Sequence, residues 1–248
     1  MQEEVRGCFN NTANTYADLY TGRTRVSHFF NARKHLVEGL LADVVVSGSS
    51  ALEVGCGPGI MVNYFLQRGA DYHGLDLSSE MIARCRTKFQ GVDSARFFVG
   101  DVQQMNFPDA SFDVVLCLGV LEYVPAEARA LREVARVLKP GGTFLFSAIN
   151  KWSPFNLWER LVYRKVTHKG PGPIVREFHT NEFYQKLLPA CGFAIIDEMY
   201  FDFNLLGRPL DEMIPEIALP LSERLERLSR SRFRKLGNGF LLKCRVKK

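Results

Sequence analysis

Through the middle of the chain, short apolar runs typical of strands alternate with segments whose apolar residues have a helical period. Apolar runs of strand length occur at residues 50–54, 72–77, 95–99, 112–118 and 143–149. Apolar residues with a helical period follow or separate these runs at residues 61–66, 79–89, 127–138 and 181–191. Such alternation predicts an α/β fold, in which a doubly wound, mostly parallel sheet is covered by helices on both faces.

Three further segments surround this alternating core. A helix with one buried stripe is predicted over residues 24–46, so we expect residues 1–46 to form an N-terminal helical cap. Residues 150–179 and 204–238 exceed the roughly 12–15 residues of ordinary connections, and such segments are commonly lids or binding elements. Because one hydrophobic core can serve a chain of this length, residues 1–248 are expected to form one domain with two lid insertions.

Composition narrows the class of protein. The chain has 248 residues, of which 46% are hydrophobic and 24% are charged, as in ordinary globular proteins. Its first residues lack the basic and then apolar order of a secretory signal, and no apolar run approaches the roughly 20 residues that cross a bilayer. The six cysteines show no metal-ligand spacing, so reduced thiols are expected. These features predict a soluble, cytoplasmic protein.

The formal net charge of +5 is concentrated near the C-terminal end. From position 224 onward, Glu226 stands alone against the basic residues Arg224, Arg227, Arg230, Arg232, Arg234, Lys235, Lys243, Arg245, Lys247 and Lys248. A solvated basic face is the simpler interpretation, and an anionic partner is the alternative.

A glycine loop follows the first predicted strand, in the sequence Leu52-Glu53-Val54-Gly55-Cys56-Gly57-Pro58-Gly59. Glycines let such a loop turn tightly and let its backbone approach a ligand at a helix N-terminus. Dinucleotide sites use G-x-G-x-x-G, whereas the third glycine here comes one residue earlier, which disfavours a dehydrogenase. Asp76 ends the second strand about 20 residues on, where an acid can accept both hydroxyls of a ribose. An adenosine ligand without a pyrophosphate is therefore expected.

Five motifs carry a resemblance to a known family. E-V-G-C-G-P-G, G-L-D-L-S, V-G-D-V, F-D-V-V-L-C and L-K-P-G-G-T-F follow one another over roughly residues 50–150. In this order they are similar to the motifs of class I S-adenosylmethionine-dependent methyltransferases. The resemblance implies that residues 47–150 are the cofactor-binding core. It also implies a seven-stranded sheet of order 3-2-1-4-5-7-6, closed by an antiparallel hairpin of residues 193–201 and 239–246.

The same resemblance implies which residues bind S-adenosyl-L-methionine. Glu53, Gly55, Gly57 and Gly59 would lie beside the methionine part, and Leu118 would line its arm. Asp76, with Leu77 beside it, would hold the ribose. Asp101 would accept a hydrogen bond from the adenine amino group, with Val102 packed on the ring.

Methyl transfer from a sulfonium needs alignment and exclusion of water, and a base becomes useful when the acceptor is a hydroxyl. Glu122, His179 and Tyr16 are the candidate catalytic residues. Helix capping and packing are the structural alternatives for Glu122 and His179. Residues 118–123 resemble the metal-associated segment of ubiquinone-type O-methyltransferases. Gly119 and Tyr123 replace an acid and a histidine of that pattern, so no metal is predicted.

Residues 153–166 read as an amphipathic helix. Phe155, Trp158, Leu161, Val162 and Val166 share one face, which is predicted to close over the acceptor. Phe203, Leu205, Leu206 and Met213 would contribute from the second insertion. A small, largely apolar or aromatic acceptor, with O-methylation favoured, is expected. Tryptophan beside basic residues also suits transient contact with a membrane surface, and simple packing of this helix on the domain is the alternative.

Two other functions compete with this prediction. A nucleic-acid methyltransferase would share the cofactor domain, but the N-P-P-Y type of motif after the fourth strand is replaced by Leu116-Cys117-Leu118-Gly119. A non-catalytic cofactor-binding scaffold is disfavoured because the glycine loop and both adenosine acids are present. The sequence therefore favours a small-molecule acceptor over nucleic acid, and it does not specify the oligomeric state.

Overall fold

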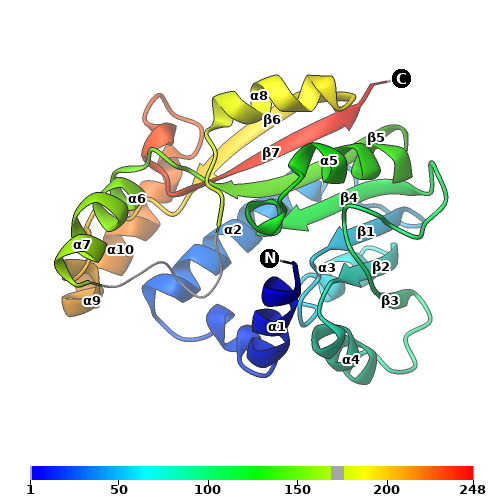
Figure 1. Cartoon of the computed structure of the whole chain (residues 1–248), viewed down its shortest axis with the longest axis horizontal. Coiled ribbons are helices and arrows are strands. Elements are labelled where there is room, and N and C mark those ends of the chain that lie inside the picture. Colours follow the sequence, from blue (N-terminus) through cyan, green and yellow to red (C-terminus); the bar gives the residue numbers. More distant parts are fainter. Residues whose placement is uncertain (1, 169–175, 248) are drawn as a thin grey trace.

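A seven-stranded sheet forms the centre of the computed structural model, which describes residues 2–168 and 176–247 (Figure 1). The strand order is β3-β2-β1-β4-β5-β7-β6, and β7 runs antiparallel to both of its neighbours. The strands are β1 Ser50–Val54, β2 Asp71–Asp76, β3 Ala95–Val99, β4 Phe112–Leu118, β5 Leu138–Ile149, β6 Phe193–Phe201 and β7 Gly239–Val246. The predicted fold class, strand order and antiparallel edge are thus confirmed.

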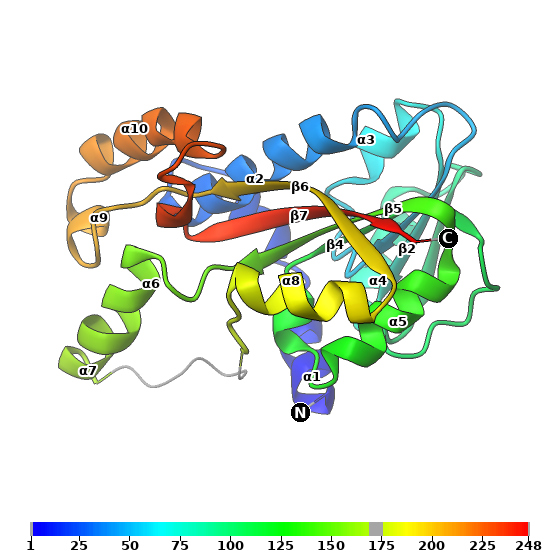
Figure 2. The same cartoon turned by 90° about the horizontal axis from the view of Figure 1, so that it is seen from above.

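Helices cover both faces of this sheet (Figure 2). The α-helices are α1 Gln2–Thr12, α2 Arg25–Leu41, α3 Val62–Leu66, α4 Ser79–Lys88, α5 Glu127–Val137, α6 Pro154–Trp158, α7 Arg164–Val166, α8 Asn181–Ala190, α9 Leu210–Met213 and α10 Pro215–Leu225. Short 3-10 turns lie at η1 Tyr16–Tyr20, η2 Leu121–Tyr123, η4 Glu226–Leu228 and η5 Arg234–Leu236, and a π-helical turn, η3 Glu159–Tyr163, joins α6 to α7.

Two buried clusters, one on each face, follow from the alternation of side chains along the strands. Leu52 and Val54 of β1 belong to the cluster under α5 and α8, whereas Ala51 belongs to the cluster under α2, α3 and α4. The central strand β4 divides in the same way and is buried on both sides. A strand buried on both faces needs a continuous apolar run, which is why residues 112–118 were readable as a strand.

Side-chain caps fix where several helices begin. Thr24 and Ser27 form a reciprocal capping box at the start of α2, and Ser78 accepts a hydrogen bond from the Met81 N–H at the start of α4. Thr180 caps α8 through the Phe183 N–H. The helix α2 ends at Leu41, five residues before the predicted end at 46, and the chain then turns toward β1.

The strand β5 begins earlier than predicted. A strand was predicted from residue 143, but Leu138 already pairs with Phe112 of β4. Gly141 adopts a φ of +75°, and the pairing shifts register before Val114 pairs with Thr143. The glycine turn is therefore an irregularity inside the strand rather than its boundary.

The two insertions meet beside the carboxyl end of the central strands. In Figures 1 and 2, α6 and α7 lie near α9 and α10 at one end of the molecule. The indole Nε1 of Trp158 donates to the backbone oxygen of Arg208 at 2.7 Å, and Arg208 forms an ion pair with Glu159 at 3.3 Å. Residues 169–175 of the first insertion lie outside the described part of the chain. None of the described helices is long and apolar enough to span a membrane.

Candidate functional site

The glycine loop after β1 is held by the carboxylate of Asp76. The Gly57 N–H donates to Oδ2 of Asp76 at 2.9 Å, and the Ser78 N–H donates to Oδ1 at 2.8 Å. Gly55 and Gly57 have φ values of +70° and +51°, which side chains rarely adopt. A Cβ at Gly55 would also collide with Val120, so the loop and the segment after β4 approach each other closely. These contacts orient Asp76 at the carboxyl end of the sheet.

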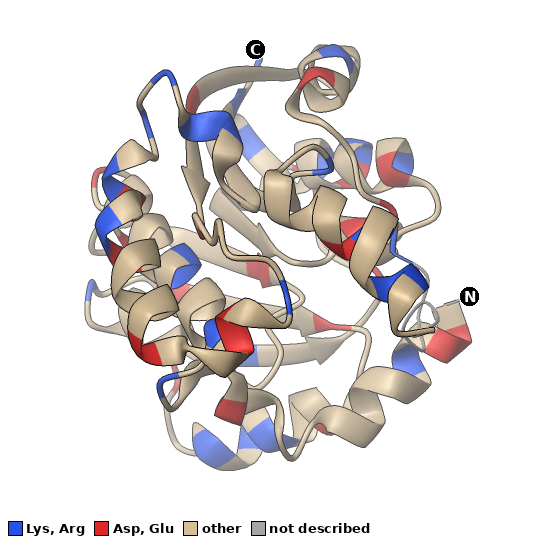
Figure 3. Ribbon diagram, turned by 90° about the vertical axis from the view of Figure 1, so that its left-hand side faces the viewer, with Lys and Arg blue, Asp and Glu red and all other residues tan. Residues whose placement is uncertain are grey.

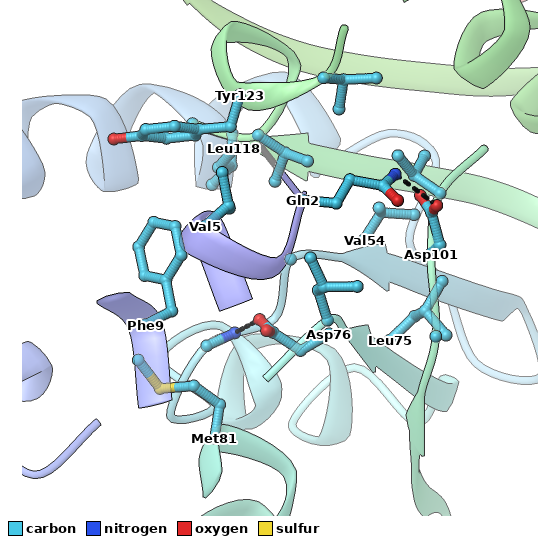
Figure 4. Close-up of a pocket in the computed structure, with 18 of the residues that line it drawn as sticks. Gln2, Val5, Phe9, Val54, Leu75, Asp76, Met81, Asp101, Leu118 and Tyr123 are labelled. Atoms are coloured by element: carbon cyan, nitrogen blue, oxygen red, sulfur yellow. Dashed lines mark hydrogen bonds between the residues drawn. The ribbon is translucent and has the colours of Figure 1, made fainter. Parts of the chain in front are cut away.

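A pocket opens beside this loop, at the carboxyl end of β1 and β4. Figure 4 shows Asp76 and Asp101 at the pocket wall with Val54, Leu75 and Leu118 close by. The predicted site residues that line it are Tyr16, Gly55, Gly57, Asp76, Leu77, Asp101, Val102 and Leu118. Side chains from four parts of the sequence thus converge at the edge where open α/β sheets bind ligands.

The N-terminal helix α1 covers part of this pocket. The Gln2 side chain donates to Oδ2 of Asp101 at 2.7 Å, and Val5 and Phe9 also line the pocket (Figure 4). The other oxygen of Asp101 accepts from the Gln103 N–H at 2.9 Å. Sequence reasoning missed Gln2, Val5 and Phe9, because the only cue was the four-residue spacing of two apolar side chains.

Glu53 and Gly59 do not line the pocket, although both were predicted beside the cofactor. Glu53 is buried and accepts a hydrogen bond from the Tyr72 hydroxyl, and burial raises the pKa of Glu53 to about 8. A Cβ at Gly59 would approach Phe89 to 2.8 Å, so this glycine permits close packing against α4. The two residues support the loop from behind, and direct contact with a cofactor stays a prediction.

A second pocket adjoins the first. Phe9, Tyr16, Gly119 and Tyr123 line both, which makes the two spaces neighbours at the end of β4. Aromatic side chains of α2 and α6 contribute Phe29, Phe30 and Phe155 to the second pocket. Six arginines also line it: Arg25, Arg33, Arg160, Arg164, Arg176 and Arg208. The second pocket is therefore aromatic and strongly basic, whereas a largely apolar one was expected.

Arg33 lines the second pocket and lies next to Gly119, which lines both pockets. Its side chain comes from α2, is buried, and would meet a Cβ at Gly119 at 3.0 Å from its Nη1. Nη2 donates to the Tyr20 hydroxyl at 3.3 Å, while Nε has no hydrogen-bond partner among the described residues. A buried cation with an open donor is costly unless an anion completes its shell.

Glu122 and Tyr16, two of the predicted catalytic residues, line the second pocket. Burial raises the pKa of Glu122, while the charges of Arg33 and Arg176 lower it in part. Its Oε2 atom has no hydrogen-bond partner within residues 2–168 and 176–247. Burial also raises the pKa of Tyr16, so this phenol stays neutral at physiological pH. Glu122 is the better placed of the two to take up a proton.

His179, the third predicted catalytic residue, lines neither pocket. Its Nε2 lies 2.8 Å from Oε1 of Glu127, and its ring stacks on Phe183 at 3.9 Å between centroids. Burial lowers the pKa of His179. Glu127, Glu177 and His179 have ligand atoms within 4.8 Å of one another, and such groupings also occur without a cation. This position favours the packing alternative for His179.

Of the apolar face of residues 153–166 that was predicted to close over the acceptor, Phe155 lines the second pocket and the other four side chains do not. The residues of this segment that line the pocket are Phe155, Asn156, Glu159, Arg160 and Arg164. Trp158, Leu161, Val162 and Val166 are exposed on the other side of the helix. In the second insertion, Leu205 and Met213 are exposed and Phe203 is fully buried, and none of these lines the pocket. A helical pattern defines two faces but does not say which one meets the domain.

Comparisons with known proteins agree with this geometry. Residues 52–146 match the family model described as a methyltransferase domain. The chain is 39% identical to a fatty-acid O-methyltransferase of Mycolicibacterium smegmatis over 127 residues, which are 50% of this chain and 46% of the relative. It is 31% identical to a ubiquinone biosynthesis O-methyltransferase of Methylococcus capsulatus over 134 residues, 52% of this chain and 55% of the relative. The chain thus spans about half the length of the curated relatives that it matches.

A solved structure resembles nearly the whole fold. The crystal structure of an S-adenosylmethionine-dependent methyltransferase from Mesorhizobium loti superimposes with a TM-score of 0.60 at 25% identity. The match covers 84% of this chain and 96% of the other. The similarity therefore extends beyond the residues of the family model.

Proposed function

Since residues 52–146 of this chain form a class I S-adenosylmethionine-dependent methyltransferase domain, we propose that the protein transfers a methyl group from S-adenosyl-L-methionine to the oxygen of a small molecule with an apolar or aromatic body. One observation carries the proposal. A pocket with two carboxylates suited to adenosine adjoins an aromatic pocket at the end of β4, so that a methyl donor and an acceptor can meet there.

The residues present fit this cofactor. Asp76 would accept hydrogen bonds from both ribose hydroxyls, and Asp101 would accept one from the adenine amino group. Arg33 would hold the carboxylate of the methionine part, which supplies the anion that its open Nε donor lacks. The bound cofactor supplies an activated methyl group, so the protein chiefly orients the acceptor and excludes water.

Glu122 would act as the general base toward a hydroxyl acceptor. Its carboxyl group lines the acceptor pocket and is buried, and burial raises its pKa, which makes it a stronger base than an exposed carboxylate. Tyr16 lines both pockets, and its ring would meet a Cβ at Gly57 at 3.9 Å, so it stands over the glycine loop. This tyrosine would separate the cofactor from solvent rather than exchange protons.

The named relatives support an apolar acceptor with an oxygen nucleophile. One is called a fatty-acid O-methyltransferase and several are called ubiquinone biosynthesis O-methyltransferases. Nucleic acid is a weaker candidate, because four of the ten basic residues counted from position 224 onward are paired with acids. Arg230, Arg234, Lys235 and Lys243 form ion pairs with Asp197, Glu198, Glu182 and Asp43. On the face seen in Figure 3, acidic and basic positions are also mixed.

Incubation with methyl-labelled S-adenosyl-L-methionine and extracts of small molecules tests the proposal. We expect label to enter a solvent-extractable product, and we expect the demethylated cofactor to bind with or without an acceptor. Binding without label transfer to any extract would favour the scaffold alternative. Label transfer to RNA or DNA, with a steep dependence on salt, would favour the nucleic-acid alternative.

Transient membrane contact is a second part of the proposal. The outward apolar stripe of α6, η3 and α7 lies beside the acceptor pocket, and Lys151 and Lys165 flank it. Apolar side chains with basic flanks suit the surface of an anionic bilayer, from which an apolar acceptor could enter the pocket.

Vesicle binding tests this contact. The double variant Leu161→Ser with Val166→Ser should bind phosphatidylglycerol vesicles more weakly than the wild type. The matched control carries Val46→Ser with Ile196→Ser, two exposed apolar side chains outside the insertions. Equal vesicle binding by both double variants and the wild type would exclude this surface.

A further inference from the structure

The basic side chains of the acceptor pocket divide into two groups. Arg25 forms ion pairs with Asp202 at 3.2 Å and Asp211 at 3.4 Å. Arg208 pairs with Glu159 at 3.3 Å and with Glu212 at 2.9 Å. These two arginines are neutralised by the fold itself. No ion pair within the described part of the chain neutralises the remaining four.

Arg33, the innermost of the four, would be matched by the carboxylate of the cofactor as described above. Arg160, Arg164 and Arg176 remain. Arg160 and Arg164 are four residues apart on the pocket side of the helical insertion, and Arg176 comes from the segment of residues 176–180 that precedes α8. The guanidinium carbon of Arg176 lies 5.8 Å from the ring centre of Tyr123, which also borders the cofactor pocket.

The acids that line this pocket do not balance these charges. They are Glu159, which pairs with Arg208, and Glu122, a single carboxyl group beside the four arginines that no described ion pair neutralises. The wall between the arginines is aromatic, with Phe29, Phe155 and Phe178. Such a pocket favours a ligand with an apolar body and an anionic group, because arginine forks bind carboxylates and phosphates with paired hydrogen bonds.

We propose that the methyl acceptor is an amphipathic anion, whose carboxylate or phosphate group is held by Arg160, Arg164 and Arg176 while its apolar body lies against the aromatic wall. The inference rests on the proposed function, since it names the substrate class of the same site. The anion lies at the outer part of the pocket, and the oxygen to be methylated lies at the inner end near Gly119 and Glu122. Arg160, Arg164 and Arg176 therefore set specificity and take no part in the chemical step.

Binding to the protein loaded with demethylated cofactor separates this inference from the proposed function. The probes are phenylbutyrate, phenylbutyl phosphate and phenylbutanol, which share an aromatic body and differ in charge, and calorimetry gives each affinity. We expect at least one anion to bind about tenfold more tightly than the alcohol. The preference for the anion over the alcohol should be smaller in the double variant Arg160→Gln with Arg164→Gln. In the wild type, the anion with the larger preference shows whether the site recognises a carboxylate or a phosphate.

The matched control is Lys151→Gln with Lys165→Gln. It removes the same charge from the same segment, but neither lysine lines the pocket. We expect this control to keep the preference for the anion. Equal affinity for the alcohol and both anions, or equal loss of preference in both double variants, would overturn the inference. Failure of the protein to bind the demethylated cofactor would instead count against the proposed function.

Discussion

Replacing Asp76 with Ala should abolish most of the affinity for the cofactor. The Asp76 carboxylate is oriented by the N–H groups of Gly57 and Ser78, and its remaining lone pairs face the pocket. Two hydrogen bonds from ribose hydroxyls to a charged group are worth about 1.5–3 kcal/mol each. Their joint loss is about 3–6 kcal/mol, which corresponds to roughly 10²- to 10⁴-fold weaker binding.

Burial of Asp76 shifts the expected loss of affinity toward the lower end of this range. The carboxylate is already partly desolvated before a ligand arrives, which is why its pKa is raised. The Ala variant loses that cost together with the hydrogen bonds, and the freed N–H groups of Gly57 and Ser78 can be hydrated by pocket water.

Calorimetric titration with the demethylated cofactor measures the effect, and circular dichroism checks the fold. Asp71→Ala is a matched control, because Asp71 lies on the same strand but pairs with Arg96 at the surface. We expect the control to bind like the wild type. A folded Asp76→Ala protein with an affinity within about threefold of the wild type would refute the assignment of this carboxylate to the ribose.

Three further substitutions test separate parts of the site. Gly57→Val should abolish cofactor binding in a folded protein, because Gly57 lines the pocket at a φ of +51°. Gly59→Val should instead lower the melting temperature by crowding Phe89. The opposite pattern would show that the loop is misassigned. Glu122→Gln should lower kcat by about 10²-fold at unchanged cofactor affinity and remove the acid limb of the pH–rate profile, and a variant with wild-type kcat would exclude this base. The pKa of Glu53 is about 8 in the folded protein, against an ordinary value of 4.5, so the unfolded chain binds fewer protons between these pH values. The free energy of unfolding therefore falls as the pH rises from about 4.5 to about 8. Glu53→Gln should remove this decrease in stability, which is at most about 5 kcal/mol. Chemical denaturation at several pH values measures it. An unchanged dependence of the unfolding free energy on pH in the variant would contradict the reasoning.

The sheet was predictable because burial on one or both faces leaves a clear apolar pattern. The strands β1, β3, β4, β6 and β7 have the predicted bounds, since each is an apolar or alternating run between turn residues. The position of the glycine loop and Asp76 at a pocket was also predictable from a short local motif, and that of Asp101 from the family resemblance; their contact with a cofactor stays a prediction.

The acceptor side was less predictable because its geometry depends on contacts between distant segments. The helix of residues 153–166 was recognised, but the hydrogen bond from Trp158 to Arg208 belongs to the arrangement that turns its apolar stripe outward. Arg33 was missed because a single arginine in an amphipathic helix carries no local signal. His179 was selected for its chemistry, but its ring stacks on Phe183 beside Glu127 and lies outside both pockets.

The hydrogen bond from Gln2 to Asp101 makes α1 an intramolecular competitor for the adenine end of the pocket. An adenosine ligand that uses this oxygen of Asp101 must share it with, or displace, an amide that is tethered a short distance away and therefore present at a high effective concentration. The measured affinity is then a difference between two sets of hydrogen bonds. An affinity tag fused ahead of Gln2 would alter that balance, so a tag at the other terminus, which lies away from α1 in Figure 1, is the better choice for binding measurements.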